Sequence, residues 1–194
     1  MAHEPDARNC WAPEIFYDDA TDQFLIVWST TIDGAFPETY NPNDDNNHRM
    51  YYVATSDFVT YTPTQLFYDP GFNVIDGFVA KDNDRYVLFI KHESKDPVVE
   101  KNIRVAYADA AAGPYGPASA SISPAWVEGP SAVRIGAQWH LYFDGYTRGR
   151  MEGQTSSDLN GWTDITSQLS FPSGTRHGTV FRVTEEVLNA LLAL

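Results

Sequence analysis

Short runs of aromatic and β-branched residues recur through the whole chain. Seven of them are QFLIVWSTT (23–31), RMYYVATS (49–56), RYVLFIKHE (85–93), IRVAYAD (103–109), SAVRIG (131–136), WHLYFDGY (139–146) and TVFRVT (179–184). Runs of this length and composition, bounded by turn formers, are typical of β-strands. Only TEEVLNALLAL at the C-terminal end has the pattern of a helix, with Thr184 as its expected N-cap. The sequence therefore predicts an all-β fold with a short C-terminal helix.

The strands are ordered in a repeating unit of four. Each unit opens with a short apolar strand that carries a polar residue near its start, and a strongly apolar strand, a third strand and a polar segment follow. The opening residues are separated by 62, 52 and 49 residues and are Glu14, Asp76, Glu128 and His177. This spacing is close to the period of about 40 to 50 residues expected for propeller blades with loop insertions. We therefore expect one partial β-propeller domain over residues 1–194, with blades at about 11–70, 71–123 and 124–170 and a closing segment at 175–194 that begins a fourth unit.

Composition and charge narrow the ligands that such a domain accepts. Aromatic residues make up 14% of the chain, and 13 Gly and 12 Pro suit many short strands and turns. The net charge of -13 disfavours nucleic acid and anionic membranes as partners, and a neutral ligand such as a carbohydrate fits better. No apolar stretch approaches the roughly 18 residues of a membrane span, and the N-terminal residues lack the pattern of a secretory signal, which leaves the cellular location open. Cys10 is the only cysteine, and we expect it to be a buried small apolar residue.

Propeller geometry predicts that the opening residues lie together. The innermost strand of each blade runs beside the central axis, so the residues that start these strands converge at one end of the ring. Glu128, Asp76, Glu14 and His177 are then expected to face one cleft, with Trp11 as an apolar wall. Carboxylates, an aromatic ring and a histidine in one cleft suit the binding or cleavage of a sugar.

Each of these residues also has a simpler interpretation. A lone Glu128 is a charge at a strand end, His177 is a histidine bonded to the backbone, and Trp11 is a core side chain. The insertion that contains NPNDDNN (41–47) is rich in turn formers and acidic residues but lacks the spacing of a calcium loop, so no metal ligands are assigned there.

Four segments together resemble a known family. NCWAPEIFYD, NVIDGFVAKD, WVEGPSAV and RHGTVFRV, in this order and spacing, resemble glycoside hydrolases of family 43, which are five-bladed propellers that act on xylan, arabinan and galactan. The resemblance implies that Glu128 is the general acid, that Asp76 orients this acid and tunes its pKa, and that Trp11, Glu14 and His177 bind substrate. The resemblance implies no catalytic cofactor. It is compatible with a structural calcium on the propeller axis, which His177 would help to hold as in relatives.

The chain departs from the family pattern at its start. In the family a blade that carries the catalytic base precedes the WAPE strand, whereas here ten residues precede Trp11, and Asp6 among them lies in a turn-like segment. Because an inverting hydrolase needs both an acid and a base, we expect impaired hydrolysis. We also expect a homo-oligomer, since roughly three blades leave apolar faces uncovered.

Two functions from different classes follow. The first is a glycosidase that acts on plant cell-wall pentosides, as a β-xylosidase or α-L-arabinofuranosidase, by an inverting acid/base mechanism. The second is a catalytically inactive propeller fragment that binds sugar or serves as a self-assembling scaffold. The base-bearing blade is the sequence feature that separates the two.

Overall fold

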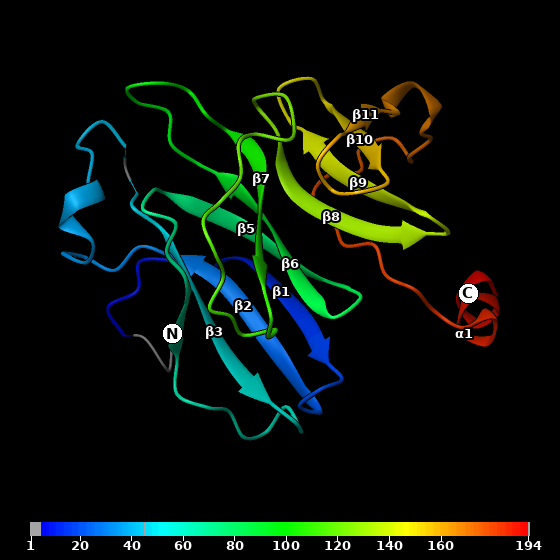
Figure 1. The fold of residues 1–194 in the computed structure, drawn as a ribbon, viewed down its shortest axis with the longest axis horizontal. Helices are drawn as coiled ribbons and strands as arrows, with labels where there is room; N and C mark the ends of the chain where they lie inside the picture. Colours follow the sequence, from blue (N-terminus) through cyan, green and yellow to red (C-terminus); the bar gives the residue numbers. More distant parts are fainter. Residues whose placement is uncertain (1–4, 45, 194) are drawn as a thin grey trace.

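A computed structural model describes residues 5–44 and 46–193, and it consists of three antiparallel sheets that lie side by side (Figure 1). The first sheet contains β1 (Trp11–Asp18), β2 (Gln23–Thr30), β3 (Arg49–Thr55) and β4 (Gln65–Tyr68). The second contains β5 (Val74–Asp82), β6 (Arg85–His92) and β7 (Asn102–Ala108). The third contains β8 (Glu128–Ile135), β9 (Gln138–Gly145), β10 (Arg150–Ser156) and β11 (Thr163–Asp164). Short 3₁₀ turns lie at Pro37–Thr39 and Thr166–Gln168.

Within each sheet the strands follow one another in chain order, as in the blades of a propeller. The first strands of the three sheets are neighbours, because β5 contacts both β1 and β8. This confirms the all-β, partial propeller fold that the repeat predicts. The second sheet has three strands and not the expected four. The segment after β7 runs beside it, with bonds from the Ser119 amide to the Val105 carbonyl and from the Ile122 amide to the Ile103 carbonyl, but it forms no strand.

The second sheet is buried on both faces. Leu25, Val27 and Met50 of the first sheet pack with Val79, Leu88 and Ile90 of the second. Its opposite face carries Phe78, Val87 and Phe89, which pack with Trp139, Leu141 and Phe143 of the third sheet. Burial on both faces explains why RYVLFIKH is a nearly continuous apolar run and does not alternate.

A bulge interrupts the first strand of every sheet. The pairing register shifts between Trp11 and Glu14 in β1, between Ile75 and Phe78 in β5, and between Glu128 and Ser131 in β8. The first residue inside each bulge has a left-handed backbone, with φ of 45° at Ala12, 55° at Asp76 and 58° at Gly129. These three residues are therefore the equivalent positions. The carboxylates that the repeat aligned, Glu14, Asp76 and Glu128, lie at different places relative to the bulge.

The segment after the third sheet differs from its prediction. TVFRVT is not a strand; it runs beside the inner strands as an extended arm over residues 175–184. Val180 donates its amide to Ser131 Oγ at 2.9 Å, and Thr179 donates its hydroxyl to Glu14 Oε2 at 2.7 Å. These are bonds to side chains, so no ladder of backbone bonds defines a strand here. The expected fourth unit is thus a connecting arm.

The prediction for the C-terminal helix is confirmed, and the prediction for Cys10 is not. Helix α1 (Glu185–Leu192) is confirmed, and its N-cap Thr184 accepts a hydrogen bond from the Val187 amide at 3.3 Å. The helix lies apart from the sheets (Figure 1). The prediction that Cys10 is buried is wrong, because this residue is exposed just before β1.

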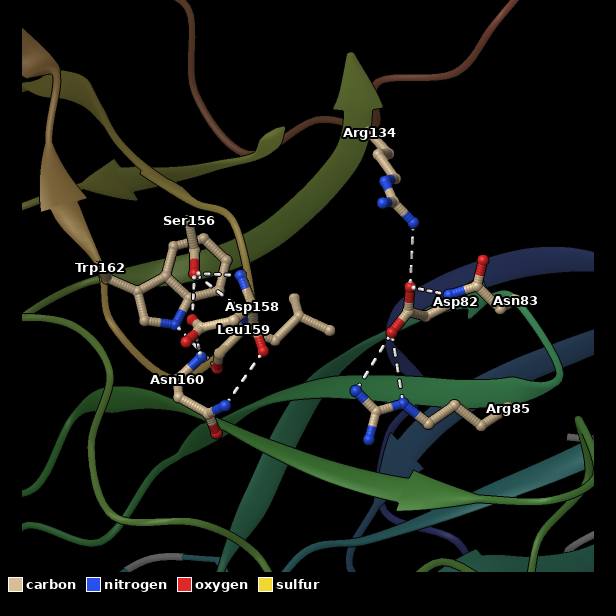
Figure 2. A network of polar contacts seen from close by, with 9 residues as sticks. All are labelled: Asp82, Asn83, Arg85, Arg134, Ser156, Asp158, Leu159, Asn160 and Trp162. Carbon is tan, nitrogen blue, oxygen red and sulfur yellow. Dashed lines mark hydrogen bonds and ion pairs between the residues drawn. The ribbon is translucent and has the colours of Figure 1, made fainter. Parts of the chain in front are cut away.

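At the end of the sheets away from the bulges, Asp82 links two blades. Figure 2 shows its carboxylate between Arg85 on β6 and Arg134 on β8, with contacts of 3.1 and 3.3 Å. In the turn that follows β10, Asp158 accepts the Asn160 amide at 2.9 Å, which places Leu159 in the core between the second and third sheets (Figure 2). The two ends of the propeller are thus built differently, with a charged clamp at one end and a polar cavity at the other.

Candidate active site

A cavity of about 350 Å³ opens where the three inner strands begin. It is lined by Trp11, Ala12, Ile75, Asp76, Lys91, Glu93, Glu128 and His177. A second hollow of about 260 Å³ shares Ala12, Asp76 and His177 with it and extends to Glu14 and Thr179. Residues of three sheets and the C-terminal arm therefore meet in one place. All five site residues expected from the sequence lie in these two adjoining hollows.

Asp76 is a buried carboxyl that lines the cavity. It is 6% exposed, and its Oδ2 accepts a hydrogen bond of 2.9 Å from the Gly129 amide. Burial raises the pKa of Asp76 above its usual range, and His177, Lys91 and the Gly129 amide act in the opposite direction. Its left-handed backbone places this carboxyl inward, and aspartate is among the residues that tolerate this conformation.

Glu128 is less buried than Asp76, and its carboxylate bonds to cations on both sides. Its side chain is 26% exposed, with Oε2 at 3.2 Å from Lys91 Nζ and Oε1 at 3.5 Å from Arg176 Nη2. The amide of the neighbouring residue, Gly129, donates a hydrogen bond to Asp76, and this bond fixes the peptide that joins Glu128 to Gly129. The carboxyl thus has access to the cavity while its strand end is held in place.

The three substrate-binding candidates take different positions. Trp11 is 41% exposed and stacks on His48, with ring centroids 4.6 Å apart, so it presents one side of its ring to the cavity. The His177 ring lies against Gly129, where an added Cβ would stand 2.4 Å from the imidazole Cδ2. Glu14 accepts the Thr179 hydroxyl and lines only the smaller hollow.

Several charged residues in and around the cavity were not singled out from the sequence. Lys91 lies near the end of β6, Glu93 follows this strand, and their side chains contact each other at 2.8 Å. Arg176 from the arm bonds to Asp144 on β9, a residue that is fully buried. Lys101 also pairs with Glu93. Their sequence signal is weak, because each lies outside the opening motifs and its partners are distant in the chain.

The described residues of the site form no cluster of metal-ligating side chains. Between residues 5 and 193, with residue 45 left aside, no group of three or more His, Cys, Asp or Glu side chains is arranged to hold an ion. The carboxylates of Asp76 and Glu128 are engaged by an amide and by two cations. Within the same residues, no helix has the length and apolar character to cross a membrane.

The arrangement defines a class of protein. A partial β-propeller with two unlike carboxyls, an aromatic wall and a histidine at its inner strand ends has the features of a glycoside hydrolase domain. A sequence model of the family related to glycoside hydrolase family 43, described as "Probable glycosyl hydrolase domain", matches residues 1–189. The chain belongs to this family.

Known relatives agree with this family. An α-L-arabinofuranosidase of Bifidobacterium longum subsp. longum is 32% identical over 94 residues, which are 46% of this chain and 9% of that protein. The crystal structure of a thermostable family 43 glycoside hydrolase has a TM-score of 0.64 at 12% identity, over 88% of this chain and 60% of that one. The α-L-arabinofuranosidase from Lactobacillus brevis has a TM-score of 0.61 at 17% identity, over 84% and 57%. At such identities the structural likeness establishes the fold, and this chain spans less than two thirds of each of these relatives.

Proposed function

We propose that the chain is a glycoside hydrolase module that acts on pentosides, with Glu128 as the general acid and Asp76 as the residue that orients it. The observation that carries this proposal is the convergence of Asp76, Glu128, Trp11 and His177 on one cavity. Two of the relatives are named for arabinofuranoside hydrolysis, which supports a pentoside as substrate.

Glu128 and Asp76 differ in exposure and in bonding partners, and this difference suits a general acid and the residue that orients it. The Glu128 side chain is 26% exposed and can contact a sugar in the cavity, whereas Asp76 is buried and bonds to the peptide next to Glu128. A general acid must lie within hydrogen-bond reach of the leaving oxygen, and a buried neighbour that fixes its backbone keeps it there. Trp11 offers an apolar ring surface for one face of the sugar.

The described residues of the proposed site include no carboxylate without a bonding partner that could act as the base of an inverting mechanism. In such enzymes the base lies about 6.5 to 9.5 Å from the acid and activates a water molecule. Among the described residues, the other carboxylates of the two hollows are engaged, since Glu93 pairs with Lys91 and Lys101 and Glu14 accepts from Thr179. We therefore infer that hydrolysis by this chain alone is impaired, and that a carboxylate from another segment or a second copy restores it.

Leaving-group dependence tests the assignment of the acid. A poor leaving group needs protonation and dinitrophenolate does not, so Glu128→Gln should slow the hydrolysis of arabinobiose and xylobiose, whose leaving group is a sugar alcohol, by about 100-fold or more and that of dinitrophenyl glycosides much less. Glu186→Gln on the exposed helix is the matched control. A Glu128→Gln variant as fast as the parent chain on the poor leaving group would refute the assignment.

An inactive self-assembling module is the alternative, and the open face of the first sheet supports it. Ile15, Tyr17 and Leu66 on this face are exposed by 54%, 48% and 48%. Helix α1 has no buried residue, and its Leu191 is 58% exposed. An eight-residue helix is marginal in water without packing, so a second copy of the chain is the occupant that we propose for both surfaces. The solution mass by light scattering tests this alternative, and a monomer at all concentrations contradicts it.

A further inference from the structure

We propose that Lys91 is a positioning residue of the site. Its buried ammonium group holds the Glu128 carboxylate at the cavity and allows the carboxyls of Asp76 and Glu128 to occupy the same cavity. This inference rests on the proposed roles of Asp76 and Glu128. The observations behind it are the burial of Lys91, its contacts with carboxylates and its position one strand behind the cavity.

Lys91 reaches the cavity from the middle strand of the second sheet. Its side chain is 3% exposed, and Nζ lies 2.8 Å from Glu93 Oε2 and 3.2 Å from Glu128 Oε2. The ammonium also lies 5.0 Å from the centre of the Tyr146 ring. A lysine at this depth is costly unless opposite charges surround it, and here they come from two different sheets.

The neighbours of Lys91 keep its ammonium charged and in place. Burial acts to lower the pKa of Lys91, but Glu93, Asp76 and Glu128 outweigh it and hold the pKa above its usual value. Glu93 is fixed in turn by Lys101. The charged and titratable groups around this cluster are His48 before β3, Asp76 on β5, His92 on β6, Glu93 after β6, Lys101 before β7, Glu128 on β8, Tyr146 after β9, and Arg176 and His177 on the arm.

Lys91 and Arg176 both contact the Glu128 carboxylate, but they differ in burial. Arg176 contacts the other carboxylate oxygen at 3.5 Å, and its side chain is 58% exposed. An exposed arginine exchanges this contact for water or substrate at little cost, whereas the buried Lys91 cannot turn to water and has only the neighbouring carboxylates as partners. Lys91 is therefore the more persistent partner of Glu128, and displacement of Arg176 leaves one oxygen of Glu128 to face the sugar.

The replacement Lys91→Met keeps the alkyl stem and removes the charge. Because Lys91 lowers the pKa of Asp76 against the effect of burial, the loss of its charge should let the pKa of Asp76 rise further. Lys91→Arg keeps the charge and should restore the original behaviour. Lys81→Met, which removes an exposed lysine paired with Asp19 in the turn after β1, is the matched control.

Titration of the Asp76 side chain, followed by carboxyl carbon NMR in the full chain, tests the proposal without turnover. Lys91→Met should raise the midpoint, Lys91→Arg should return it to near the parent value, and Lys81→Met should leave it unchanged. An unchanged midpoint in a folded Lys91→Met variant would overturn the proposal.

A second measurement covers the case in which Lys91→Met does not fold. The ammonium nitrogen signal of Lys91 should differ between the parent chain and the Glu128→Gln variant, because Lys91 loses one of its carboxylate partners in the variant. No change in this signal would overturn the proposal equally. Pentoside binding and hydrolysis measured on the same samples separate the two ideas. A parent chain that neither binds nor hydrolyses a pentoside, but whose Asp76 still responds to Lys91, contradicts the proposed hydrolase and supports the role of Lys91.

Discussion

Asp76 Oδ2 accepts a 2.9 Å hydrogen bond from the backbone amide of Gly129, and this contact joins the bulges of two neighbouring inner strands. Both residues have left-handed backbones, with φ of 55° and 58°. Since Gly129 follows Glu128 directly, the bond between blades also fixes the peptide that carries the proposed acid. Blade packing and site geometry therefore depend on the same pair of residues.

Substitution of Asp76 should separate the loss of its hydrogen bond from the loss of its charge. Asn keeps an acceptor for the Gly129 amide and tolerates the left-handed backbone, whereas Ala does neither. Asp76→Ala should lower the free energy of unfolding by about 2 to 4 kcal/mol and Asp76→Asn by about 1 kcal/mol or less. Urea denaturation measures both values. Equal losses in the two variants would show that the bond to Gly129 does not stabilise the fold.

A side chain at position 129 should displace His177. The Cβ of Gly129→Ala would lie 2.4 Å from the His177 ring, and the backbone there is left-handed. Gly136→Ala is the control, because its φ is 61° but no atom lies within 4 Å of the added Cβ. Gly136→Ala should cost about 1 kcal/mol from backbone strain, and Gly129→Ala should cost more and shift the imidazole signals of His177. Identical effects of the two substitutions would contradict the contact.

Two buried histidines should make stability fall in mild acid. Burial lowers the pKa of His48 to about 4, and burial together with Arg104 lowers that of His92 to about 4. The unfolded chain therefore binds more protons than the folded chain between pH 6.5 and 4, and stability decreases as the pH falls through this window.

The loss is about 3 kcal/mol for each histidine when both have charged. Urea denaturation at several pH values measures it, and His48→Gln should reduce the slope by roughly half, because Gln carries no titrating group. A variant with an unchanged slope would show that His48 is not the source of the dependence.

Self-association should respond to charge on the open face of the first sheet. Ile15→Glu should lower the mass measured by light scattering, because Ile15 is 54% exposed on that face and a charge there opposes apolar contact. Val59→Glu is the matched control, since Val59 is 79% exposed and lies in the loop after β3. An oligomer that persists in the Ile15 variant would place the interface elsewhere.

The fold was predictable because apolar runs mark the strands strongly. RYVLFIKHE and WHLYFDGY coincide with β6 and β9, and Thr184 caps α1 as its position before two acidic residues indicates. TVFRVT has the same composition but lies beside side chains without a backbone partner, so its apolar pattern was insufficient. Cys10 is exposed because it precedes a strand whose outward face is open.

The candidate site was only partly predictable. The opening motifs indicated Asp76 and Glu128, because propeller geometry brings inner strand ends together. The register of the inner strands depends on their bulges. The equivalent bulge positions carry three different residue types, Ala12, Asp76 and Gly129, so no common residue marks the bulge in the sequence. Lys91 stands inside an apolar run, and its role depends on partners in another blade.

An NMR titration of the chain with arabino- and xylo-oligosaccharides is the most direct test of pentoside binding in the cavity at the inner strand ends. We expect the signals of Asp76, Gly129 and His177 and the indole signal of Trp11 to shift with increasing sugar, and the signals of the Asp82 clamp at the far end of the sheets to stay unchanged. The absence of shifts at the cavity, or shifts confined to another surface, would contradict pentoside binding there.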